Sequence, residues 1–67
     1  MAVPHPVYVL EDNLEAARLK AVEALAAEGG AISADALREI TALQTALTAV
    51  REVIETHGPR LGWGDKS

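Results

Sequence analysis

The chain has 67 residues, no cysteine, and a formal net charge of −4. A chain of this length forms at most one domain, and the lack of cysteine excludes disulfides and thiolate metal sites. The acidic balance and the scattered basic residues disfavour nucleic acid and anionic membranes as partners, since both bind clustered lysine and arginine. The apolar fraction is 49%, with many alanines and few aromatic residues, a composition that suits closely packed helices.

No apolar run approaches the roughly 20 residues that a membrane-spanning helix needs. The N-terminal residues do not resemble a signal peptide, because no charged segment precedes an apolar stretch. The sequence therefore predicts a cytoplasmic protein.

Residues 1–11 are predicted to form an extended arm. Two prolines, Pro4 and Pro6, disfavour a helix start there, and residues 7–10 are a short β-prone run. This run is too short to build a sheet by itself. It is expected either as an extended arm or as a strand that pairs with its counterpart in a dimer.

A first helix is predicted over residues 13–28. Asp12 is a suitable N-cap, with Glu15 three residues later as in a capping box, and Gly29 and Gly30 end the helix. Its apolar side chains gather on one face of a helical wheel: Leu10, Leu14, Ala17, Ala21 and Leu25.

A second, longer helix is predicted over residues 33–57, with Ser33 as N-cap and Gly58 and Pro59 as the stop. The short connection predicts an antiparallel helical hairpin. Residues 58–67 are predicted to be an irregular tail, and residues 1–67 together form one domain.

The second helix carries a heptad seam and, beside it, a second apolar stripe. The stripe makes the apolar arc wider than one partner helix covers. In an antiparallel hairpin the shorter first helix is also predicted to reach along the second helix only as far as Val50. Residues 50–57 then need a cover, either from residues 7–10 or from a second copy. The seam consists of Ala36, Ile40, Leu43, Leu47, Val50, Ile54 and His57. The stripe consists of Ala42, Ala46, Ala49 and Val53.

Two hairpins that dimerise into a four-helix bundle are the simplest solution, so the fold class is all-α. The alternative is a monomeric hairpin capped by its own arm and tail. Trp63 is expected either as an anchor in a partner or packed on its own hairpin. The predicted interface residues are Leu14, Ile40, Leu43, Ala46, Leu47, Ala49, Val50, Val53, Ile54 and Trp63.

We find no catalytic constellation, no metal-ligand spacing and no nucleotide-binding loop, and we expect no catalytic residue, metal or cofactor. His57 is more simply a histidine at a helix C-terminus than a ligand. The predicted function is a non-enzymatic protein–protein interaction module: a small, self-associating regulator, adaptor or assembly factor. Two alternatives remain open, namely a DNA-binding regulator of the helix-turn-helix type and a metal or catalytic site formed only at an oligomer interface.

Overall fold

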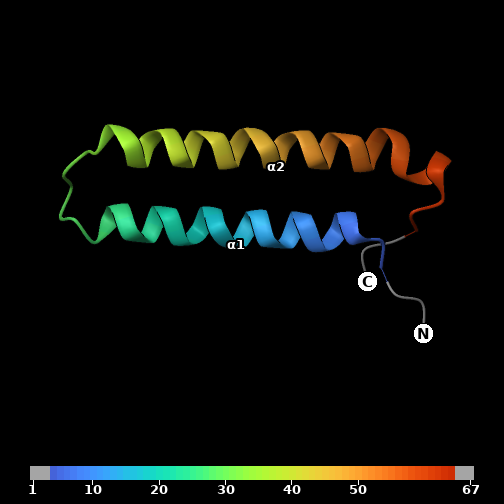
Figure 1. Cartoon of the computed structure of the whole chain (residues 1–67), viewed down its shortest axis with the longest axis horizontal. Helices are drawn as coiled ribbons and strands as arrows, with labels where there is room; N and C mark the ends of the chain where they lie inside the picture. The colour runs from blue at the N-terminus through green and yellow to red at the C-terminus, as the bar shows by residue number, and fades with distance from the viewer. Residues whose placement is uncertain (1–3, 65–67) are drawn as a thin grey trace.

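The computed structural model describes residues 4–64 as two antiparallel helices joined by a short connection (Figure 1). Helix α1 spans Pro6–Ala26 and helix α2 spans Ala34–Leu61. The Cα atoms extend over 44 × 23 × 11 Å, so the molecule is a single layer of two helices. The described residues contain no strand. The prediction of an all-helical, antiparallel hairpin is therefore confirmed.

The contact between the helices follows a heptad pattern in both of them. All seven predicted seam positions of α2 are half-buried or, at Leu47, fully buried. The matching seam of α1 has the spacing 4, 3, 4, 3, 4, which is typical of antiparallel packing of two helices along their length. Its half-buried members are Val7, Glu11, Leu14, Arg18, Ala21 and Leu25.

The prediction of an extended arm over residues 1–11 is wrong from Pro6 onward. Helix α1 begins at Pro6 itself, and residues 7–10 are helical. Proline is tolerated at the first helical position because its missing N–H has no partner there in any helix. His5 replaces the expected Asp12 as N-cap, since its Nδ1 accepts a hydrogen bond from the N–H of Val7 at 3.1 Å. Residues 1–3 of the predicted arm lie outside the described residues.

Helix α2 begins as the sequence predicts. Ser33 has extended backbone angles (φ −97°, ψ 128°), and its Oγ accepts a hydrogen bond from the N–H of Ala36 at 3.3 Å. Asp35 lies in the first turn, where the helix dipole favours a negative charge. The side chain of a serine at this position therefore satisfies one of the free N–H groups at the helix start.

The predicted end of α2 at His57 is wrong, because the helix continues through Gly58 and Pro59 to Leu61. Proline disfavours helical angles in the residue before it by a clash with the Cβ atom, and Gly58 has none. The helix ends in a Schellman motif. The N–H of Trp63 donates to the carbonyl of Gly58 at 3.0 Å, the N–H of Gly62 donates to Pro59 at 3.4 Å, and Gly62 is left-handed with φ 73°.

Residues 27–33 connect the helices. Gly29 and Gly30 have φ angles of 72° and 91°, which side chains with a Cβ atom rarely adopt. The chain reverses at these glycines, but their predicted role as the cap of a helix ending at residue 28 is wrong: α1 ends at Ala26, and its C-cap is Ala27, with right-handed angles (φ −65°, ψ −16°).

The early start of α1 also corrects the length argument. Because α1 begins at Pro6, its first turns lie beside the end of α2 (Figure 1), and Val50, Ile54 and His57 are half-buried within the single chain. The sequence left two covers open for residues 50–57, the segment 7–10 of the same chain or a second chain. The structure shows that this end of α2 is not left as an overhang within the single chain. Tyr8, from the predicted arm, is instead one of the best buried side chains, with 6% of its surface exposed.

Leu47→Ala tests whether the seam holds the hairpin together. Leu47 is fully buried, and its truncation should lower the free energy of unfolding by about 2–5 kcal/mol, because lost apolar burial and a cavity add up. Denaturant unfolding followed by circular dichroism measures the change. Thr45→Ala, on the exposed side of the same helix, serves as the matched control and should change stability by less than about 0.5 kcal/mol. Equal losses in the two variants would contradict the assigned seam.

Candidate association surface

The structure divides the predicted interface residues into two groups. Most of them pack within the chain, between α1 and α2: Leu14, Ile40, Leu43, Leu47, Val50 and Ile54. Ala46 is half-buried at the edge of this seam, whereas Ala49 and Val53 are exposed, with 41% of the surface of Val53 accessible. The seam therefore accounts for the first group, and the exposed residues mark a surface that one hairpin leaves open.

Each side of the two-helix layer can be assigned from the seam and the helical repeat. A residue three positions after a seam residue lies about 60° to one side of it, and a residue one position after lies about 100° to the other side. Because α1 and α2 face each other and run in opposite directions, the same step along either helix leads to the same side of the layer. The hairpin thus has two distinct broad faces.

One face, here called the groove face, carries the polar contacts between the helices. Arg51 reaches two carboxylates of α1, with Nε 3.3 Å from Oε2 of Glu11 and Nη2 3.6 Å from Oε2 of Glu15. Arg18 donates to Oε1 of Gln44 at 2.6 Å, and Gln44 donates to the hydroxyl of Thr48 at 3.2 Å. An open groove of about 660 Å³ lies between these groups, lined by Asp12, Glu15, Ala16, Arg18, Leu19, Val22, Ile40 and Gln44.

The opposite side, here called the apolar face, consists of residues three positions after seam residues, together with two further alanines of α2. Leu10 is 47% exposed although the sequence suggested that it faces the second helix. Half-buried Leu14 and Val50 border this face from the seam. The exposed members continue along both helices. With half-buried Ala46, the apolar members of this face are Leu10, Ala17, Ala24, Ala42, Ala46, Ala49 and Val53, and the same rule places the charged Glu39 and Arg60 on it.

The sequence analysis missed the role of Leu10, Ala17 and Ala24 because it assigned α1 a purely apolar inner face. The true seam of α1 includes Glu11 and Arg18, whose long side chains run along the contact and direct their charged ends toward polar groups of α2. The available signal was the charge order: a carboxylate and an arginine seven residues apart in α1 match Arg51 and Gln44, seven residues apart in α2.

Aromatic side chains close the end of the hairpin that lies opposite the connection. The rings of His5 and Trp63 stack with centroids 4.5 Å apart and an angle of 19° between planes. The hydroxyl of Tyr8 donates to the carbonyl of Gly64 at 2.5 Å. Gly58 is buried beneath Trp63, since a Cβ atom there would lie 3.7 Å from the indole ring. We call these residues (His5, Tyr8, Gly58, Trp63 and Gly64) the end cluster; it places Trp63 on its own hairpin.

A further contact between titratable side chains lies at the end of α2. Nη2 of Arg60 donates to Nδ1 of the half-buried His57 at 2.5 Å. No group of three or more metal-ligating side chains occurs between residues 4 and 64. Within the same range, no helix is long and apolar enough to cross a membrane.

A scan against protein-family models finds no match, and searches of the curated proteins and of the solved structures find none either. The assignment of a function therefore depends on the surfaces of the hairpin alone.

His5→Ala tests the end cluster. The variant loses the N-cap of α1 and the ring stacked on Trp63, so it should lower the free energy of unfolding by about 1–3 kcal/mol and shift the Trp63 emission to longer wavelength. Thermal melting and fluorescence measure both effects. His57→Ala removes the other histidine, which does not stack on Trp63, and should leave the emission maximum in place. An unchanged emission in His5→Ala would contradict the stacked arrangement.

Proposed function

We propose that the protein is a non-enzymatic interaction module that acts as a pair of hairpins, with two copies packed into a four-helix bundle. The observation that carries this proposal is the exposed surface of the single chain. The accessible surface is 4973 Å² for a mass of 7.1 kDa. A compact monomer of that mass exposes about 4,100 Å², so the hairpin exposes about 900 Å² more.

This surplus has the size of an ordinary protein interface. Stable complexes bury about 800 Å² on each partner. Tyr8 and Leu47 are the only buried large apolar side chains among residues 4–64, so one hairpin alone has a very small core. A short chain without disulfides commonly gains its remaining stability from a partner chain. Association of two copies would meet this need.

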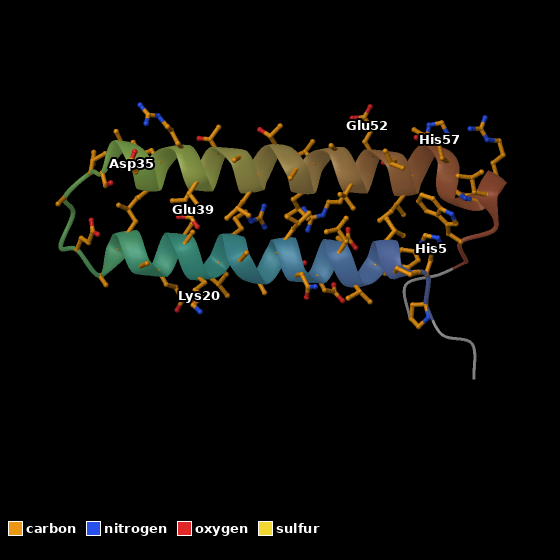
Figure 2. All side chains as sticks on the ribbon, in the orientation of Figure 1. His5, Lys20, Asp35, Glu39, Glu52 and His57 are labelled. Carbon is orange, nitrogen blue, oxygen red and sulfur yellow. The ribbon has the colours of Figure 1, made fainter. Side chains whose placement is uncertain are left out.

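The surface composition supports a protein as the partner. Arg18 and Arg51 both point across the groove face, but the carboxylates of Glu11 and Glu15 lie beside them, and the net charge is −4. A helix-turn-helix reader instead presents a helix with side chains suited to base edges and phosphates. The outer side of α2, with Thr41, Thr45 and Glu52, has no basic cluster, and Glu52 points away from α1 (Figure 2). These features support our proposal of a small regulator, adaptor or assembly factor.

The oligomeric state tests this proposal directly. Sedimentation equilibrium at micromolar concentration should give about twice 7.1 kDa, and the melting temperature should rise with protein concentration, because association stabilises the folded chain by mass action. A monomer that melts cooperatively at a temperature independent of concentration would refute it.

DNA binding, the second function considered, has its own test. A mobility-shift assay with mixed duplex DNA at low salt should show no complex, because an acidic chain gains little from counterion release. Binding that weakens steeply with added salt would instead favour the DNA-binding alternative.

A further inference from the structure

The four-helix bundle proposed above leaves open which face of the hairpin is covered and how the two copies are oriented. This inference rests on that proposed function. We infer that a second copy docks on the apolar face, with the twofold axis parallel to the helices, so that each α1 lies on the α2 of the other copy.

The groove face also exposes apolar side chains, with 61% of Leu19 and 46% of Val22 accessible, but its charged contacts make it the poorer candidate. It holds the Arg51 ion pairs and the Arg18–Gln44 hydrogen bond, and Arg51 still exposes 44% of its side chain. Covering this face would withdraw two guanidinium groups and their carboxylates from water, and the mutual attraction of buried ions often fails to offset that cost. The apolar face carries none of these three polar contacts. Apart from Glu39 and Arg60, its members are leucine, alanine and valine, which lose little when they are covered.

The register between α1 and α2 fixes which residues lie at the same height along the hairpin. Arg18 contacts Gln44, and Arg51 contacts Glu11, so residues whose numbers add up to about 62 lie side by side. A twofold axis parallel to the helices preserves these heights in the second copy. Across the new interface Leu10, Ala17 and Ala24 of one copy therefore lie opposite Val53, Ala46 and Glu39 of the second copy.

This order matches side chains by size and charge. The two larger apolar groups, Leu10 and Val53, meet at one end, and Ala17 meets Ala46 in the middle, where two small residues allow the helices to approach closely. The charged Glu39 lies opposite Ala24, which leaves room for its carboxylate to turn outward. Lys20, at the rim of α1 on the edge away from α2 (Figure 2), lies within one helical turn of the same height.

Glu39 decides between this orientation and its competitor. In the competing arrangement the twofold axis lies in the plane of the interface, perpendicular to the helices, and α2 packs on α2 of the second copy. Glu39 of each copy would then lie opposite Val53 of the other, once near each end of the interface. A carboxylate would be covered by an apolar side chain without a positive partner, which is costly. With the parallel axis, Glu39 instead faces the small side chain of Ala24, and both Lys20 and Glu28 of the second copy lie about one helical turn away along the chain. The smaller opposing side chain thus favours the parallel axis.

Cysteine cross-linking tests the face and the orientation together, in a chain whose sequence has no cysteine of its own. Ala17→Cys and Ala46→Cys chains, one of them carrying a longer tag, are refolded together and oxidised. The parallel axis predicts a disulfide-linked dimer of one chain of each kind, and no dimer from either variant alone. The matched control is Ala16→Cys, whose side chain lines the groove, refolded with Ala46→Cys; it should give no linked dimer.

The outcomes separate the two proposals. Sedimentation of the reduced variants shows first whether a dimer forms, and a monomer would overturn the proposed function as well. A dimer in which Ala17→Cys links to itself would overturn the parallel axis, and a dimer linked through Ala16→Cys would overturn the choice of face.

A charge exchange gives a second, independent readout. Lys20→Glu places a carboxylate near Glu39 of the other copy and should weaken dimerisation about five-fold or more, since pairs of like charge replace pairs of opposite charge at two symmetric positions. Adding Glu39→Lys should restore the affinity. Equal dissociation constants for the single variant, the double variant and the unchanged chain would overturn the assigned pairing.

Discussion

Two helices can cover one side of each other and no more, and this constraint shapes the whole molecule. The contact between α1 and α2 buries Leu47 completely and half-buries a single line of residues on each helix. Every other apolar side chain must find its cover elsewhere or remain exposed. Polar side chains that cross the seam on one face and an apolar surface on the other give the hairpin two unequal sides.

The sequence was a good guide wherever a local rule decided the structure. Heptad spacing predicted the seam of α2, and Ser33 predicted its start, because capping and periodicity depend on neighbouring residues. Local rules failed at both outer ends of the helices. Pro6 was interpreted as a barrier to α1 and Pro59 as the stop of α2, whereas one lies at the first helical position and the other follows a glycine.

The misassigned ends have a tertiary cause. Residues 5 and 63 stack, and residues 8 and 64 share a hydrogen bond, although they lie at opposite ends of the chain. A pattern read over one helical turn does not contain such contacts. The same limit applies to the candidate surface. Alanine and leucine positions on α1 were correctly identified as an apolar face, but only the register with α2, set by Arg18 and Arg51, shows that part of this face points away from the seam.

The connection of residues 27–33 also determines the order in which the molecule assembles. A tether of this length holds α1 at an effective concentration in the millimolar range relative to α2. Helices and short loops form within microseconds, whereas an encounter between two chains depends on their concentration. Because Gly29 and Gly30 allow the tight reversal without strain, each chain closes on itself before it meets another. In the proposed dimer the closed hairpin is therefore the unit expected to associate, because exchange of α1 between chains would first have to open this contact within the chain.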